Sequence, residues 1–247
     1  MTTILHGNSL NQPIVDVRRD RERFHTRAGW LDSYHSFSFS HHYDPANTHH
    51  GLLRVSNDDV IKAGTGFSTH PHQDMEIVTW VLDGELEHKD SVGNKGIIYP
   101  GLAQRMSAGT GIWHSEMNPR GDRDVRLVQM WVLPDTESAD PGYEQLDINS
   151  QLKQGGLVPI ASGRGHQAAI SIRQRGAVLW GGRLRPGESA RIPESRFVHL
   201  YVAKGAVELE EAGSLAAGDA VRLTAAGARR MTADPTTGAE VLLWEME

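Results

Sequence analysis

The sequence contains no cysteine, no long apolar run and no excess of positive charge. The absence of cysteine excludes disulfides, thiolate metal sites, iron–sulfur clusters and cysteine nucleophiles. No apolar run approaches the ~18 residues of a membrane span, and the first residues lack the layout of a signal peptide, so we expect a cytoplasmic protein without membrane contact. With 25 Lys and Arg against 31 Asp and Glu, the net charge of −6 argues against direct nucleic-acid binding.

Histidine, in contrast, is abundant, with 13 of the 247 residues. Because the chain has no thiolates, any metal that it binds must be held by nitrogen and oxygen ligands. The length allows one large domain or two small ones, with enough chain for a substantial core.

Glycine and proline punctuate the whole chain, at 26 and 11 residues, and are not gathered in a linker. Short apolar and β-branched runs lie between them, such as residues 77–82, 127–132 and 197–202. Such runs with a turn about every ten residues predict an all-β barrel or sandwich. Asp83-Gly84 predicts a β-hairpin, and a short turn or helix is expected around residues 143–154.

An internal repeat indicates two copies of one β unit. Residues 79–87 resemble residues 200–208, and two further glycine turns follow in each half. The segment 134–150 between them begins with a polar stretch rich in helix and strand breakers. We therefore expect an N-terminal domain over residues 1–140 and a C-terminal domain over residues 141–247.

The sharpest chemical signal is a pair of i, i+2 motifs, His70 with His72 and His114 with Glu116. Alternate residues of a strand point to the same face. Two such pairs on neighbouring strands can therefore bring three imidazoles and one carboxylate together inside a barrel. This ligand set suits iron, manganese, nickel, copper or zinc. Glu76 has the same parity as the first pair and would share its face unless a bulge intervenes.

The simpler alternative is that these are ordinary polar strand residues, but two such pairs beside glycine turns favour a bound metal. The positions of the second half that align with the three histidines hold Arg191, Pro193 and Thr232. We therefore expect one metal per chain, in the N-terminal half. The adjacent histidine pairs at 41–42 and 49–50 predict a loop that is solvated or rims the site.

Longer motifs around these residues resemble the pirin family of the cupin superfamily over about residues 27–134. They are residues 30–31, 36–39, 53–59, 70–76, 86–91, 104–112 and 114–116. The resemblance implies a bicupin of two stacked antiparallel β-barrel (jelly-roll) domains with the metal in the N-terminal one. By position, the implied ligands are His70, His72, His114 and Glu116.

Pirin-like proteins similar to this one are associated with quercetin 2,3-dioxygenase activity, in which O₂ opens a flavonol ring and carbon monoxide is released. The resemblance thus implies a flavonol and O₂ as substrates. It also implies one divalent transition metal, Fe(II) first, with Ni, Cu, Mn, Zn or Co as alternatives. A carboxylate ligand can shift towards a substrate hydroxyl, which makes Glu116 the expected base. We expect Trp113 and Met106 in the apolar pocket wall and Glu76 near the ligands but outside their set.

Two other functions stay open at this point. Some pirin relatives are metal-dependent regulators that act through protein partners, for which the acidic balance of this chain is suitable. A different metal-dependent reaction, such as an isomerisation, could use the same ligands, because fold does not fix chemistry. Access separates catalysis from regulation: a catalyst needs an open route to the metal.

Overall fold

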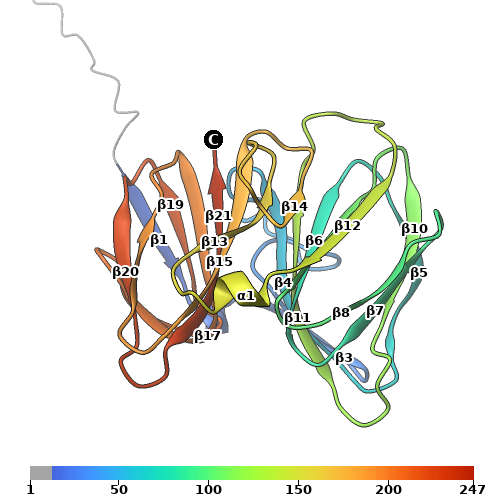
Figure 1. Cartoon of the computed structure of the whole chain (residues 1–247), viewed down its shortest axis with the longest axis horizontal. Helices are drawn as coiled ribbons and strands as arrows, with labels where there is room; N and C mark the ends of the chain where they lie inside the picture. Colours follow the sequence, from blue (N-terminus) through green and yellow to red (C-terminus); the bar gives the residue numbers. More distant parts are fainter. Residues whose placement is uncertain (1–12) are drawn as a thin grey trace, which may run out of the picture.

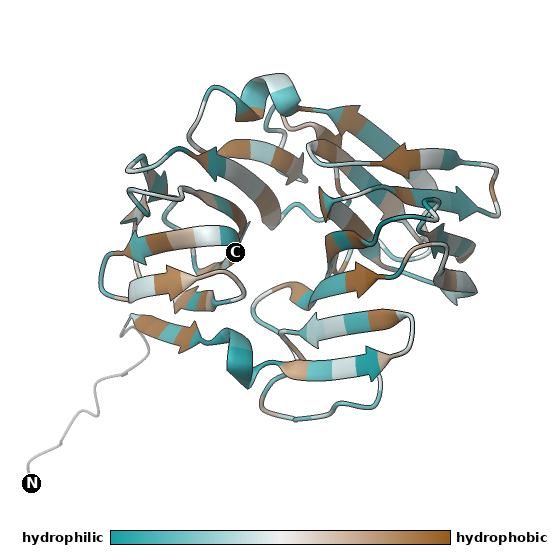
Figure 2. Cartoon of the chain, turned by 90° about the horizontal axis from the view of Figure 1, so that it is seen from below, coloured by the Kyte–Doolittle hydropathy of each residue, from teal (hydrophilic) through white to brown (hydrophobic). Residues whose placement is uncertain are grey.

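The computed structural model of the chain describes residues 13–247, which form twenty-one strands, one 3-10 helix, η1 (Asp20–Glu22), and one short α-helix, α1 (Asn149–Leu152). The strands lie in two facing halves with α1 between them (Figure 1). Hydrophobic and hydrophilic bands alternate along many strands (Figure 2), as expected for sheets with one face in a core. The predicted all-β bicupin is confirmed, with jelly-roll-like open sheets in place of closed barrels.

The N-terminal half consists of two sheets. The four-stranded sheet has the order β5 (Gly66–His72), β10 (Ile112–Met117), β7 (Leu86–Asp90), β8 (Lys95–Ile98). The seven-stranded sheet has the order β12 (Gly142–Asp147), β9 (Leu102–Ser107), β6 (Glu76–Asp83), β11 (Val125–Val132), β4 (Leu53–Ile61), β3 (Leu31–His35), β2 (Phe24–Ala28).

The C-terminal half is one ten-stranded sheet. Its main path is β1 (Ile14–Arg18), β19 (Ala220–Thr224), β17 (Phe197–Leu209), β21 (Ala239–Met246), β15 (Ala177–Leu184), β13 (Val158–Ser162), β14 (Ile170–Ser171). Off this path, β20 (Arg229–Ala233) pairs with β16 (Ser189–Ile192) and β17, and β18 (Gly213–Ala216) pairs with β17.

Two strands pair with the half to which they do not belong by sequence. β1 forms an edge of the C-terminal sheet against β19, where Figure 1 shows it in blue beside orange and red strands. Conversely, β12 pairs with β9 of the N-terminal half over its full length. The division at residue 140 stays a prediction, and these two pairings cross it in opposite directions.

Two local predictions need correction. Asp83-Gly84 does not form a hairpin: Gly84 has a positive φ of 80°, but the turn leads from β6 in the seven-stranded sheet to β7 in the four-stranded sheet. The dipeptide predicts the turn correctly, but the packing of the two sheets determines with which strands β6 and β7 pair. Of the expected helix at 143–154, only α1 is helical, because residues 142–147 pair with β9 as β12.

Apolar packing joins the two halves. One core cluster contains Trp80 and Met130 of the N-terminal half together with Tyr201 and Trp244 of the C-terminal half. The indole of Trp80 also donates a hydrogen bond of 2.9 Å to the Glu240 carboxylate. The burial of these large side chains makes this contact a major source of stability.

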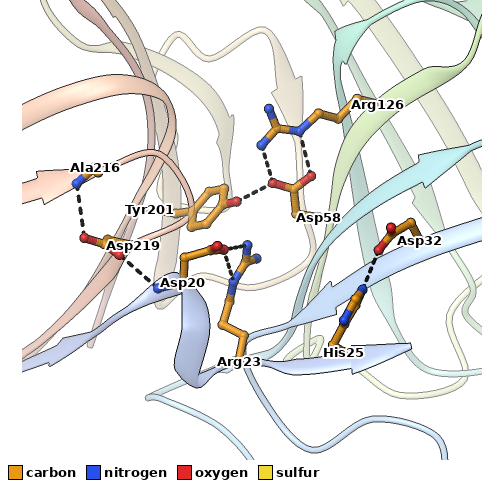
Figure 3. A network of polar contacts seen from close by, with 9 residues as sticks. All are labelled: Asp20, Arg23, His25, Asp32, Asp58, Arg126, Tyr201, Ala216 and Asp219. Atoms are coloured by element: carbon orange, nitrogen blue, oxygen red, sulfur yellow. Dashed lines mark hydrogen bonds and ion pairs between the residues drawn. The ribbon is translucent and has the colours of Figure 1, made fainter. Parts of the chain in front are cut away.

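A polar network lies at the edge of this contact (Figure 3). Asp58 of β4 is buried and accepts two hydrogen bonds from Arg126 of β11, at 2.9 and 2.6 Å. The Tyr201 hydroxyl of β17 donates to the same carboxylate. Because both partners are present, the buried charge of Asp58 is compensated across the boundary between the halves. Among residues 13–247, no helix is long and apolar enough to cross a membrane.

Candidate metal centre and adjoining cavity

The three predicted histidine ligands come together on two neighbouring strands. His70 of β5 lies directly opposite His114 of β10, and His72 lies opposite Ile112. The ring centroids of the three histidines are 4.4 to 4.9 Å apart, and one ring nitrogen of each lies within 4.8 Å of the other two. Strand alternation therefore places them as the sequence predicted.

The ring nitrogens of this cluster lack protein partners on the side where a metal would bind. Nδ1 of His70 donates to the carbonyl of Ser68 at 2.8 Å, which leaves the Nε2 lone pair free. Nε2 of His72 and Nε2 of His114 are buried without a hydrogen-bond partner among residues 13–247. Burial lowers the pKa of His72 to about 4 and that of His114 to about 3, so both rings are neutral at pH 7. Unpartnered buried nitrogens are costly, and a metal would satisfy them.

Glu116 enters the same region through a bulge. The pairing of β10 with β5 shifts between His114 and Glu116, so that His114 lies opposite His70 and Glu116 lies opposite Phe67. Glu116 and His114 form a second possible metal-holding group with His88. His114 belongs to both groups, whereas Glu116 is grouped with His88 and not with His70 or His72, with which it shares the lining of one cavity.

Two residues that the sequence did not single out hold the Glu116 carboxylate. Nε2 of Gln129, on β11, lies 3.0 and 2.8 Å from the two carboxylate oxygens. Trp131 donates its indole N–H to Oε1 of Gln129 at 3.1 Å, which fixes the orientation of the amide. The i, i+2 spacing of Gln129 and Trp131 places both on one face of a strand, but it does not identify Glu116 as their partner.

A fourth histidine, His88, lies directly behind His114. It is fully buried, with Nδ1 3.5 Å from Nδ1 of His114 and Nε2 3.3 Å from the Asp90 carboxylate. The ring of Tyr143, from β12, packs on it at 4.9 Å between centroids. The i, i+2 spacing of His88 and Asp90 on β7 is the signal that could have identified this contact.

A cavity of about 270 Å³ adjoins the histidine cluster. It lies between the two sheets of the N-terminal half, and Leu31, Phe39, Phe67 and Trp131 form its apolar wall. His41 also lines the cavity, as expected for a loop that rims the site. The remaining lining residues are Thr26, Ser33, His35, Ser40, Asn57, Asp59, His70, His72, Glu116 and Gln129.

Glu76, expected near the ligands, and Met106 and Trp113, expected in the pocket wall, lie outside the cavity. Glu76 begins β6 in the other sheet and accepts from the Ser107 hydroxyl at 2.8 Å, because Asp74, with φ of 46°, breaks the strand after β5. Met106 is buried in a small apolar cluster. Trp113 points outward from β10 and is 53% exposed. None of the three lines the cavity.

The corresponding region of the C-terminal half is filled differently. Ile192 of β16 and Met231 of β20 are part of a buried apolar cluster. Arg191, which aligns with a histidine, is exposed and lies opposite Arg230. The absence of a metal from this half stays a prediction.

Comparisons with known proteins identify both halves. The pirin family model matches residues 16–132, and the model of the quercetinase C-terminal cupin domain matches residues 159–246. A Mycobacterium tuberculosis protein named "Putative quercetin 2,3-dioxygenase" is 55% identical over 94% of this chain and 95% of its own length. The Escherichia coli quercetin 2,3-dioxygenase is 43% identical over 79% of this chain and 84% of its own.

A solved structure agrees over nearly the whole chain. The nickel(II) complex of the bacterial pirin YhhW from Escherichia coli superposes with a TM-score of 0.86, at 38% identity, over 94% of this chain and 99% of that one. The relatives imply a metal, and the histidine and carboxylate donors described above fit one. The chain therefore belongs to the pirin family and, at the level of that family, is a pirin-type cupin dioxygenase.

Proposed function

We propose that this protein is a metal-dependent dioxygenase that opens a quercetin-like flavonol with O₂ and releases carbon monoxide. The observation that carries the proposal is the pair of buried, unpartnered Nε2 atoms of His72 and His114 beside an aromatic-walled cavity. The relatives that are named quercetin 2,3-dioxygenases support the substrate class.

We assign one divalent metal per chain to His70, His72, His114 and Glu116. Imidazole and carboxylate donors suit iron and its neighbours, and we propose Fe(II), with Ni, Cu, Mn, Zn and Co as alternatives. When bound, the metal supplies the redox and Lewis-acid chemistry that side chains lack.

Glu116 is the proposed base of the reaction. One of its carboxylate oxygens accepts the proton of the flavonol 3-hydroxyl, while Gln129 holds the carboxylate in place. Phe39, Phe67 and Trp131 contact the flat rings of the substrate and exclude water from the reacting end.

Access to the histidines favours catalysis over a purely regulatory role. His70 and His72 both line the cavity and are only partly buried, so a small molecule reaches them from that side. A sensor that acts through a protein partner does not need such a cavity. An accessible metal site would also serve a different metal-dependent reaction, which is therefore the alternative form of catalysis.

The test is an aerobic assay of the Fe(II)-reconstituted protein with quercetin, in which carbon monoxide, O₂ uptake and flavonol absorbance are followed together. We expect one carbon monoxide per flavonol consumed, and loss of this product in His70→Ala. Trp113→Ala is the matched control, because this exposed side chain lies on β10 but outside the cavity. Loss of absorbance without carbon monoxide, in a protein of confirmed metal content, would contradict the proposal.

A further inference from the structure

The inner face of the seven-stranded sheet carries polar side chains where a β core is normally apolar. Ser33 of β3 lies directly opposite Asp59 of β4, and His35 lies opposite Asn57. These four side chains, which we call the polar wall, are only 1 to 4% exposed and line the cavity. They belong to a different sheet from His70 and His72.

Hydrogen bonds behind the wall hold part of it in place. The Ser33 hydroxyl donates to Oδ1 of Asp59, and Nδ1 of His35 lies 3.4 Å from the Ser33 hydroxyl. Thr26 lies 2.9 Å from Nε2 of His35, so both ring nitrogens of this histidine have partners. These contacts turn Asp59 towards the cavity with one oxygen already paired.

Two acceptors of the wall are left over. Oδ1 of Asn57 is buried without a partner, and among residues 13–247 the Asp59 carboxylate accepts a hydrogen bond only at Oδ1, from Ser33. A buried polar atom without a partner costs free energy, and native proteins satisfy nearly all of them. Because both atoms belong to residues that line one cavity, a ligand in that cavity is the natural partner.

We propose that Asp59 and Asn57 form a hydroxyl-binding subsite for the end of the substrate that lies away from the metal-binding histidines. The inference rests on the proposed function and narrows it to aromatic substrates that carry hydroxyl groups on both ends of a flat ring system. Ser33 and His35 are positioning residues of this subsite. Leu31 and Phe39 offer apolar surface to the rings between the two polar ends.

The chemistry of Asp59 matches a phenolic hydroxyl. Burial, followed by the nearby carboxylates of Asp58 and Glu116, raises the pKa of Asp59 to about 7 despite the hydrogen bond from Ser33. Near neutral pH the group can therefore donate or accept, as a hydroxyl also does. A substrate with a carboxylate at this end would meet the ionised form of Asp59 with like charge, so the subsite disfavours such a substrate once Asp59 has lost its proton.

The test compares two flavonols by binding, without turnover. Dissociation constants of quercetin and 3-hydroxyflavone, which lacks all hydroxyls except the one at position 3, are measured anaerobically with the Fe(II)-loaded protein. We expect the natural protein to prefer quercetin about tenfold or more, because the analogue leaves the polar wall unpaired. In Asp59→Leu and in Asn57→Leu the preference should fall towards one, with little change for 3-hydroxyflavone.

Ser56→Ala is the control, because alternation on β4 places Ser56 on the opposite face, with Asp58. If a leucine variant does not fold in a thermal melt, Asp59→Asn and Asn57→Ser replace it and should each reduce the preference. Equal affinity of the natural protein for both flavonols, or a preference that survives in both variants, would overturn the inference while leaving the proposed function intact. Binding of neither flavonol would overturn the proposed function and this inference together.

Discussion

Gln129 places its amide nitrogen 3.0 and 2.8 Å from the two carboxylate oxygens of Glu116, while its amide oxygen accepts the indole N–H of Trp131. The ring of Trp131 also packs edge-on against His72 at 4.9 Å. One aromatic side chain therefore contacts a proposed histidine ligand and orients the residue that holds the proposed carboxylate ligand.

Removal of the Gln129 amide should weaken metal binding. Side chains that orient metal ligands contribute about 10- to 100-fold to metal affinity. We therefore expect Gln129→Leu to bind the metal about 10- to 100-fold more weakly. Competition with a chelator measures this affinity directly. Trp131→Phe, which keeps the ring but not the N–H, should show a smaller loss in the same direction. An unchanged affinity in both variants would mean that Gln129 does not position Glu116.

Glu116→Gln separates the two roles assigned to this carboxylate. Loss of a general base costs about 10²- to 10⁴-fold in rate, whereas the amide oxygen can still face the metal between three histidines. We expect turnover of quercetin to fall by at least about 100-fold while most of the metal is retained. His70→Ala is the contrasting variant and should lose both. Undiminished turnover in metal-loaded Glu116→Gln would rule out the base.

Loss of Arg126 should destabilise the protein by uncovering Asp58. The carboxylate of Asp58 is buried, and Arg126→Met leaves it with Tyr201 alone, which we expect to cost about 3 kcal/mol in the free energy of unfolding. Lys62→Met is the matched control, because its ion pair with Asp124 joins the ends of the same two strands at the exposed surface. That change should cost less than about 1 kcal/mol. Equal losses in denaturant unfolding would contradict this ranking.

Asp59 should make stability depend on pH. Its pKa in the folded protein is about 7, against about 3.9 in an unfolded chain, so the folded state holds the proton more tightly. Its contribution to stability is complete below pH 4 and is lost as the pH rises to 7. The asparagine side chain of the variant cannot titrate, so Asp59→Asn should become more stable relative to the natural protein as the pH rises from 4 to 7. The difference in the free energy of unfolding should grow by about 1.4 kcal/mol per pH unit. Denaturant titrations at pH 4 to 8 measure this difference, and a constant difference would refute the assigned pKa.

Local patterns predicted the class of fold but not the pairing of strands. Alternation and glycine turns are encoded within a few residues, so the all-β architecture and its two halves could be predicted from them. Asp83-Gly84 predicts a hairpin that does not form, because a turn dipeptide does not determine which sheet receives the next strand. The sequence predicts a short turn or helix around residues 143–154, but residues 143–147 pair with β9 through contacts far apart in the sequence.

The same distinction applies to the site. His70, His72 and His114 could be predicted because parity along a strand is a local property. Glu76 has the same parity in the sequence, but the left-handed conformation of Asp74 interrupts the alternation, and Glu76 begins a strand of another sheet. Gln129 reaches Glu116 from β11, and no short-range pattern reveals that these two strands face one another.

The pairing of β1 with β19 has a consequence for how the protein is made. Residues 14–18 are synthesised long before their partners, residues 220–224. Such distant contacts are slow to form because a long loop must close first. During translation the other strands of the N-terminal half can pair with one another before β19, the partner of β1, has been made. The late strand β19 therefore determines when β1, one of the earliest strands, takes its place at the edge of the C-terminal sheet.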